Sequence, residues 1–228
     1  MPARSIMRTS VVASVLAALL AASPYAAHAT IIDPTGDFLP SYAGTKDPGL
    51  DVISAGATFD GQQFVLTATM AGPIASLKTS VPGALFVFGV DRGKGTERFL
   101  LGSPAIGAGI KFDSVLVLRL TGVSSFNDLL NNTSTPLPAA NFQIDGATIM
   151  AELPVSFAPS QGLDPSAYGF NLWPRSGAGM NNQIADFAPN ASSFTATLVP
   201  EPASLALLGA GLIGAATVRR RRNSAALR

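Results

Sequence analysis

Four aspartates lie close together and are the first candidates for chemistry in this chain. Asp33, Asp37, Asp47 and Asp51 fall within nineteen residues, and three glycines are interspersed among them. Ca²⁺ takes six to eight oxygen ligands and tolerates irregular loops, so such a loop could bind it. The spacing does not match the EF-hand pattern. We interpret the four residues as solvated aspartates in Asx turns. A Ca²⁺ site is the alternative hypothesis, and no other cofactor is expected.

An aromatic residue is the second candidate for ligand binding. Trp173 is the only tryptophan, and Arg175 follows it closely. An exposed indole with a nearby guanidinium could bind a sugar ring. However, Tyr168 and Phe170 alternate with Trp173 along an expected strand, which puts Trp173 on the opposite face. A core position is therefore the preferred interpretation, and a ligand-binding pair Trp173 and Arg175 is the alternative.

The residue types exclude several classes of enzyme. The chain has no cysteine, and its only histidine, His28, lies near the N-terminus. Catalysis by Ser-His-Asp or Cys-His groups therefore has no residues to use after position 28, and neither does a zinc or copper site built on imidazole or thiolate. A hydrolase with two carboxylates could use Asp91 with Glu97, or Asp145 with Glu152. Nothing in the sequence brings either pair together, so we expect no catalytic residues and no enzyme.

The elements that must position these residues are strands joined by turns. Gly, Pro, Ser, Thr and Asn interrupt residues 30–198 every eight to twelve positions. Residues 51–59 and 64–70 alternate around Asp60-Gly61, which predicts a hairpin with Ile53, Ala55, Ala57 and Phe59 on one face. Residues 141–144 and 147–153 around Asp145-Gly146 predict a second hairpin. The apolar run 84–90 predicts a central strand that is buried on both faces.

The remaining segments complete an all-β prediction. Further strands are expected at residues 98–101, 111–112, 114–120, 167–173, 183–187 and 193–198, and a loop at 131–138. Residues 124–130 predict one short helix, with Ser124 or Ser125 as N-cap and Phe126, Leu129 and Leu130 on one face. About nine short strands predict an antiparallel β-sandwich of jelly-roll-like order.

The N-terminus has the three parts of a secretory signal peptide. Arg4 and Arg8 precede an apolar stretch at 11–22, and Ala27-His28-Ala29 forms an A-x-A cleavage site. Cleavage between Ala29 and Thr30 is therefore expected. We predict a signal helix in residues 1–29, export through the Sec translocon, and a mature protein that begins near Thr30.

The C-terminus has a second tripartite pattern. Val199-Pro200-Glu201-Pro202 is followed by 16 uncharged residues, 203–218, and then by Arg219-Arg220-Arg221-Arg222. A helix of that length spans roughly 24 Å, which is marginal for a bilayer core of about 30 Å. We predict a single transmembrane helix at 203–218. The four arginines would stop transfer and stay cytoplasmic, with the basic tail running to residue 228.

This tail, residues 199–228, resembles the PEP-CTERM sorting signal. The resemblance rests on Pro200-Glu201-Pro202, the Leu, Ala and Gly-rich segment and the arginine block. It implies recognition and processing by an exosortase near the motif, an intermediate anchored in the inner membrane, and association with exopolysaccharide in biofilm. The segments Val90-Asp91-Arg92-Gly93, 171–175 and 183–189 also resemble other PEP-CTERM exported proteins. A weaker resemblance, on 33–37, Asp51 and Glu152-Leu153-Pro154, is to DOMON-like carbohydrate-binding sandwich modules.

The charge of the central region completes the functional prediction. The whole chain has a net charge of +1, but residues 30–199 contain eight basic and thirteen acidic residues, a net charge of −5. An acidic domain does not suit nucleic acid binding. We predict an exported cell-surface or extracellular-matrix protein, structural or adhesive, in which residues 30–198 form the sandwich domain. The alternative is a carbohydrate-binding module, with or without Ca²⁺, that acts on the exopolysaccharide.

Overall fold

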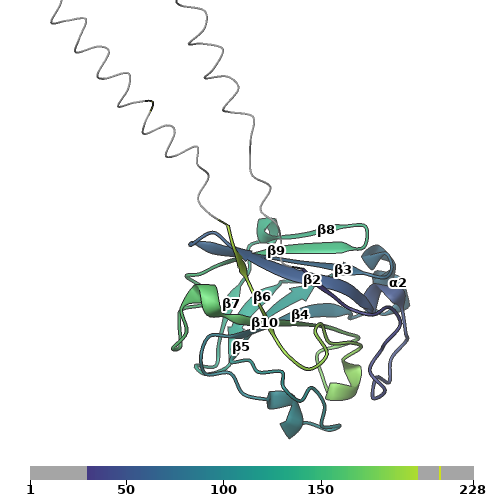
Figure 1. The fold of residues 1–228 in the computed structure, drawn as a ribbon. Coiled ribbons are helices and arrows are strands. Elements are labelled where there is room, and N and C mark those ends of the chain that lie inside the picture. The colour runs from purple at the N-terminus through teal and green to yellow at the C-terminus, as the bar shows by residue number, and fades with distance from the viewer. Residues whose placement is uncertain (1–29, 200–210, 212–228) are drawn as a thin grey trace, which may run out of the picture. The chain divides into compact units, whose positions relative to one another are not determined.

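Residues 30–199 fold into two β-sheets that pack face to face (Figure 1). A computed structural model describes these residues and Gly211. Residues 30–199 belong to one compact unit. The predicted antiparallel β-sandwich is therefore confirmed.

The first sheet has the order β1-β2-β3-β9-β8, and β12 pairs with β2 in parallel. All of its other pairs are antiparallel. Its strands are β1 (Thr30–Ile32), β2 (Val52–Phe59), β3 (Gln63–Met70), β8 (Phe142–Asp145), β9 (Thr148–Pro154) and β12 (Thr197–Leu198).

The second sheet has the order β11-β10-β4-β5-β6-β7 and is antiparallel throughout. Its strands are β4 (Leu85–Asp91), β5 (Ser114–Arg119), β6 (Ser125–Asp128), β7 (Thr133–Pro136), β10 (Gly169–Arg175) and β11 (Phe194–Thr195). Strands β4 to β7 form a meander within one sheet, whereas jelly rolls are built from Greek keys. The predicted jelly-roll-like order is therefore wrong at these strands.

Short helices connect the strands. Between residues 30 and 199 there is one α-helix, α2 (Leu77–Ser80), so the prediction of one short helix is confirmed in number but not in position. The 3₁₀ turns are η1 (Pro48–Leu50), η2 (Ile74–Ser76), η3 (Arg98–Leu101), η4 (Ala139–Asn141), η5 (Pro165–Ala167) and η6 (Asn181–Gln183). Among the described residues, no helix has the length and apolar character needed to cross a bilayer.

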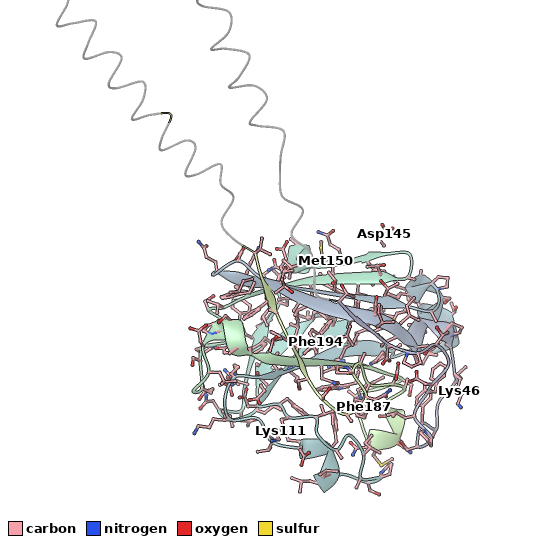
Figure 2. All side chains as sticks on the ribbon, viewed as in Figure 1. Lys46, Lys111, Asp145, Met150, Phe187 and Phe194 are labelled. Atoms are coloured by element: carbon pink, nitrogen blue, oxygen red, sulfur yellow. The ribbon has the colours of Figure 1, made fainter. Side chains whose placement is uncertain are left out.

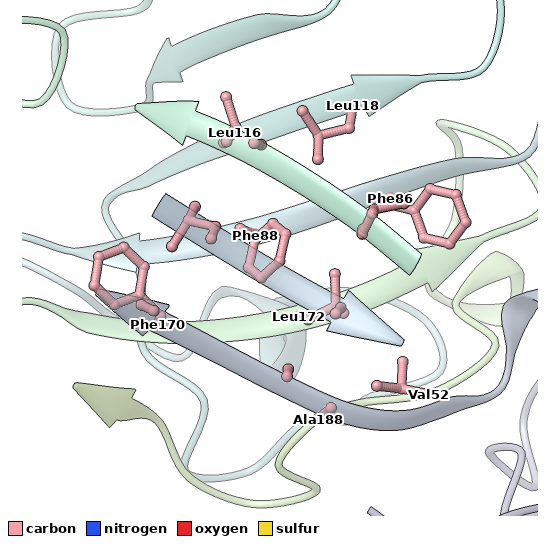
Figure 3. Packing of buried hydrophobic residues seen from close by; sticks show 14 of the residues in the cluster. Val52, Phe86, Phe88, Leu116, Leu118, Phe170, Leu172 and Ala188 are labelled. Carbon is pink, nitrogen blue, oxygen red and sulfur yellow. The ribbon is translucent and has the colours of Figure 1, made fainter. Parts of the chain in front are cut away.

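The core between the sheets consists of the alternate residues of their central strands. Phe64 of β3 stacks on Tyr168 and meets Phe170 of β10 edge-on, with ring centroids 5.6 and 5.2 Å apart. Figure 3 shows part of this core around Phe88, Phe170 and Leu172, which are fully buried. Burial of one such side chain contributes about 1.5–3 kcal/mol, so this interior holds the two sheets together.

A second apolar cluster covers the outer face of the second sheet. It consists of Leu85, Val87, Phe99, Ile110, Phe112, Trp173, Ile184 and Phe187. Segments 96–112 and 181–188 supply five of these eight residues and lie over the sheet. Strand β4 is therefore buried on both faces, as its continuous apolar run predicts.

The two hairpins form as predicted, but a bulge in β2 changes which residues at its start face the core. Strand β3 buries Phe64, Leu66, Ala68 and Met70. In β2 the register shifts between Val52 and Ser54, and a bulge of this kind moves residues to the other face. Val52 is therefore fully buried in the core, and the prediction that Ile53 belongs to the inner face is wrong.

Four other local predictions are wrong. Residues 125–128 of the expected helix 124–130 form strand β6, and the expected loop at 131–138 contains strand β7. The expected strand at 98–101 is the 3₁₀ turn η3. The expected strand at 183–187 makes one isolated bridge, Arg175 with Ile184, and the next bridge, Leu172 with Ala188, lies just after it.

The predicted signal and sorting segments lie mostly outside the described residues. This applies to the signal helix, to Ala27 and Ala29, to Pro200-Glu201-Pro202, to the transmembrane segment 203–218 apart from Gly211, and to Arg219–Arg222. Thr30, the predicted mature start, is the first residue of β1. The predicted boundaries of these segments stay predictions.

Candidate metal centre

Three carboxylates from distant parts of the chain converge at one point. One carboxylate oxygen each of Asp33, Asp37 and Asp186 lies within 4.8 Å of the others. Asp33 and Asp186 are 6% and 0% exposed, and Asp37 is half-buried. Oxygens that share a Ca²⁺ at about 2.3–2.6 Å lie no more than about 5 Å apart. The three groups therefore have a spacing that one cation can bridge.

The backbone of β1 and β2 positions the first two aspartates. Strand β1 pairs with β2, and the N–H of Asp33 extends this pairing by donating to the carbonyl of Ile53 at 3.1 Å. The chain then turns at Gly36, where φ is 84°, a value that favours glycine. The Gly36 N–H donates to Asp51 Oδ2 at 2.8 Å. This turn returns Asp37 toward Asp33.

Asp186 is fixed by two backbone donors. The N–H of Val52 donates to Asp186 Oδ2 at 3.0 Å, and the N–H of Phe187 donates to Oδ1 at 2.7 Å. Val52 belongs to β2, so these bonds connect the segment after β10 to the first sheet. Backbone N–H groups, and not a basic side chain, therefore fix the Asp186 carboxylate in the interior.

The centre has no cationic side chain that would balance its carboxylates when they are ionised. Within residues 30–199 the ion pairs join Arg92 to Asp113 and Asp128, and none reaches this centre. Buried carboxylate oxygens Asp33 Oδ2, Asp37 Oδ1 and Asp51 Oδ1 have no hydrogen-bond partner there. The side chain of Asn190 donates to Asp37 Oδ2 at 3.1 Å. Buried charges normally have partners or bind metals, so the arrangement lacks a counter-charge.

Burial and mutual repulsion change the acidity of these groups. Burial, with the charges of Asp37 and Asp51, raises the pKa of Asp33 to about 7. Burial, with the charges of Asp33 and Asp37, raises the pKa of Asp186 to about 8, although backbone donors oppose the shift. Burial also raises the pKa of Asp51. In the absence of a cation the centre therefore retains protons at neutral pH.

This acidity predicts a pH dependence of stability in a metal chelator. A carboxyl whose pKa rises on folding stabilises the fold below its unfolded pKa of 3.8, and this contribution is lost as pH rises through the folded pKa. In EDTA, we therefore expect the thermal midpoint to fall by several degrees between pH 5 and pH 9. Asp186→Asn should flatten that slope, as measured by calorimetry. A midpoint that rises over this range would contradict the burial of these charges.

The structure changes the membership of the predicted Ca²⁺ loop. Asp33 and Asp37 lie in the centre; the charge of Asp51 contributes to the raised pKa of Asp33, and the charge of Asp37 contributes to the raised pKa of Asp51. Asp47 is instead the N-cap of η1, where Oδ1 accepts from Gly49 N at 2.8 Å and Oδ2 accepts from the Ser80 hydroxyl at 2.6 Å. Its oxygens are therefore occupied elsewhere, and its assignment to a metal site is wrong.

The sequence does not predict that Asp186 belongs to the carboxylate centre. It stands in the apolar run Ile184-Ala185-Asp186-Phe187-Ala188, which is buried throughout. An acidic residue inside a buried apolar run was the available signal. The guanidinium of Arg175 does not pair with it and donates to the carbonyls of Gly179 and Met180 at 2.7 and 3.0 Å.

The predicted sugar-binding aromatic residue is not on the surface. Trp173 is 1% exposed and packs with Phe99, Phe112 and Phe187 in the outer cluster. It lies on the opposite face from Tyr168 and Phe170, as the alternation predicts. The indole cannot stack on a sugar from this position, which corrects the alternative hypothesis for Trp173.

The two carboxylate pairs considered for hydrolysis are not assembled into a site. Asp91 Oδ1 accepts from Gly93 N and Gly95 N at 2.9 and 2.8 Å, and Glu97 Oε1 accepts from Gly109 N. Asp145 is exposed in the β8–β9 turn at the outer edge of the first sheet (Figure 2). Asp91 and Glu97 therefore serve turn and loop contacts.

The end of the sandwich leads directly into the C-terminal pattern. Val199 N donates to the carbonyl of Phe59 at 2.9 Å, immediately after β12. Residues 198–222 match the PEP-CTERM protein-sorting motif. This chain carries a PEP-CTERM sorting signal. A search of curated proteins found no match to the chain.

The PEP-CTERM match confirms the predicted sorting signal. It contains Pro200-Glu201-Pro202 and extends through Arg219–Arg222. The motif indicates an exported protein that an exosortase processes, with a membrane-anchored intermediate. The match lies outside residues 30–197, so the chemistry of the sandwich must be argued from its own residues.

A buried ion-pair centre occupies the segment Val90-Asp91-Arg92-Gly93, far in sequence from the PEP-CTERM motif. Arg92 is fully buried, and its Nε donates to Asp113 Oδ1 at 2.7 Å. Its other nitrogens contact Asp128 Oδ2 at 3.0 Å and the carbonyl of Pro159 at 3.2 Å. Asp113 is 0% exposed. The guanidinium therefore joins β4, β5, β6 and the segment after β9, which is a structural role.

Proposed function

We propose that this protein is a cell-surface or extracellular-matrix protein that accompanies exopolysaccharide in biofilm, with a structural or adhesive role and no catalysis. The observation that carries the proposal is the PEP-CTERM motif at residues 198–222, because it indicates export and exosortase processing. The mature form would consist of the sandwich domain released from its anchor.

The chemistry of the sandwich supports a non-catalytic role. Residues 30–199 contain neither histidine nor cysteine. A hollow of about 470 Å³ beside β8 is lined by Arg119, Ser124 and mainly apolar residues, and no carboxylate lines it. Glycoside hydrolysis needs two carboxylates about 5–9.5 Å apart across the bound sugar. This hollow does not offer that pair.

Processing predicts a defined mature chain. We expect mass spectrometry of the secreted protein to find an N-terminus near Thr30 and a C-terminus near residues 200–202. In a host without exosortase, and in the variant Glu201→Ala, the chain should keep Arg219–Arg222 and fractionate with the membrane. The reason is that the anchor is removed only when the motif is recognised.

A matched control separates motif recognition from a general effect of charge removal. Asp145→Ala removes an exposed acidic side chain from the sandwich and should leave processing unchanged. A mature surface protein that still carries Arg219–Arg222 would contradict the proposal.

Carbohydrate binding is the alternative function, and it requires a surface other than Trp173. Because that indole is buried, we expect the processed protein to show no specific binding on a glycan array that includes the host exopolysaccharide. Specific binding there would support the carbohydrate-binding module in place of the structural role.

A further inference from the structure

We propose that Asp33, Asp37 and Asp186, with Asp51 beside them, form a divalent-cation site that Ca²⁺ fits. This inference is independent of the processing of the tail, because it rests only on residues of the sandwich. It differs from the loop predicted from sequence by replacing Asp47 with a residue from the other end of the domain.

The first argument is geometric. Three carboxylate oxygens from two segments lie within 4.8 Å of one another. Each segment is held by backbone bonds to β2, through Asp33 N to Ile53 O and through Val52 N to Asp186 Oδ2. The ligands are therefore preorganised by the first sheet and do not depend on one flexible loop.

The second argument is independent of the clustering itself. Asp33 is 94% buried, and its Oδ2 has no hydrogen-bond partner among the described residues. Asp51 is 2% exposed, and its Oδ1 also has no hydrogen-bond partner among the described residues. An unpaired buried carboxylate oxygen is costly unless a cation or a proton satisfies it. Asp33 contributes to the converging group, so its unsatisfied oxygen indicates a missing positive partner there.

The donor set selects the type of cation. The centre offers only oxygen ligands, and residues 30–199 contain no histidine or cysteine. Hard cations such as Ca²⁺ and Mg²⁺ prefer these donors, whereas zinc and copper sites use imidazole and thiolate. The exposed side of the centre, at Asp37 and Asn190, leaves room for water ligands. Ca²⁺ tolerates such a mixed, irregular shell, while Mg²⁺ demands near-ideal octahedral geometry.

A bound Ca²⁺ would fasten the two ends of the sandwich to each other. Asp33 directly follows β1 at the predicted mature N-terminus, and Asp186 precedes β11 and β12. Both end segments pair with β2, so the cation would crosslink strands that otherwise depend on short ladders. Its effect would therefore appear as stability of the exported protein.

The experiment measures thermal midpoints of the secreted protein in EDTA, CaCl₂ and MgCl₂ at equal ionic strength and pH 7.5. Because a ligand that binds only the folded state stabilises it, CaCl₂ at about 100 times Kd should raise the midpoint by about 5–10 °C. MgCl₂ should have a smaller effect, and calorimetric titration should give one Ca²⁺ per chain.

Variants make the test specific to the site. Asp186→Asn removes one ligand and leaves only one oxygen for the two backbone donors Val52 N and Phe187 N, so it should melt below the wild type in EDTA and should not be stabilised by CaCl₂. If Asp186 were purely structural, the variant would still gain the same stabilisation from CaCl₂ as the wild type. Asp37→Asn, at a half-buried position, should also lose the Ca²⁺ response. Asp47→Asn removes a charge from the same stretch of chain but keeps its N-cap, so its response to Ca²⁺ should equal that of the wild type.

Three outcomes would overturn the proposal. If CaCl₂ shifts neither the midpoint nor the titration heat, then the carboxyls are satisfied by shared protons alone. If Asp47→Asn loses the response and Asp186→Asn keeps it, then a cation binds elsewhere in the loop. If all variants respond alike, Ca²⁺ does not act through this centre.

Discussion

Replacing Arg92 with methionine is expected to lower the free energy of unfolding by about 3–5 kcal/mol, because it leaves a buried carboxylate without its partner. Asp113 is fully buried, and it accepts from Arg92 Nε at 2.7 Å and from the backbone N–H of Arg92 at 2.9 Å. The guanidinium also lies 5.7 Å from the centroid of the Phe126 ring. Urea unfolding followed by tryptophan fluorescence would measure the loss.

Lysine should not substitute for Arg92. The guanidinium reaches Asp113, Asp128 and the carbonyl of Pro159 with three different nitrogens, and one ammonium group cannot reproduce that fork. Lys94→Met, at an exposed position of the same turn, is the control and should change stability by less than about 0.5 kcal/mol.

A double substitution tests the cause of the loss at Arg92. Asp113→Asn removes the charge that Arg92→Met leaves unpaired, so the two changes together should cost less than the sum of their separate effects. Additive costs would show that Arg92 acts through packing and not through its charge.

The sequence predicts those parts of the fold in which a local pattern decides the structure. Asp60-Gly61 and Asp145-Gly146 each join two alternating segments, and both hairpins form at those turns. Alternation also predicts that Trp173 lies opposite Phe170. In β2 the bulge between Val52 and Ser54 reverses the alternation, and no residue type in that segment marks its position.

Short segments are decided by pairing partners and not by their own period. Residues 124–130 contain too few positions to distinguish a period of two from one of 3.6, and their apolar residues fit a helix face. In the fold, Phe126 pairs with Leu116 of β5 and with Thr135 of β7, so the segment becomes β6. The neighbouring strands therefore override the local preference.

The candidate metal centre could be predicted only in part for the same reason. Asp33, Asp37 and Asp51 are near one another in sequence, and this spacing alone indicates a possible metal-binding loop. Asp186 reaches them because β10 belongs to the second sheet while the segment after it returns to β2. The spacing of residues in the sequence does not show that the segment with Asp186 returns to β2. Asp47 has the right spacing, yet its side chain caps η1.

Adding a methyl group at Gly89 is expected to destabilise the outer cluster by about 1–3 kcal/mol or more, as overpacking of a dense core does. Gly89 lies in β4 between Asn171 and Val115. A Cβ built there would overlap the six-membered ring of Trp173 and approach Phe112 Cβ at 3.3 Å. Gly89→Ala should therefore lower the midpoint of urea unfolding, although alanine suits an ordinary strand.

The outcome of Gly89→Ala should depend on the residue at position 173. Trp173→Phe shortens the ring that the new methyl group would meet, and it removes an indole N–H that has no hydrogen-bond partner within residues 30–199. In that background Gly89→Ala should be tolerated, with a coupling energy of about 0.5–3 kcal/mol between the two sites. Trp173→Ala, by contrast, should cost about 3–5 kcal/mol through the cavity that it leaves.

This cycle also tests the assignment of Trp173 to the core. If Gly89→Ala costs the same with tryptophan or phenylalanine at position 173, then the two residues are not in contact and the indole does not cover β4. An exposed tryptophan would also emit at longer wavelength and be quenched by iodide in the folded protein. Because the structure buries it among Phe99, Phe112 and Phe187, we expect blue-shifted emission that iodide does not quench until the protein unfolds.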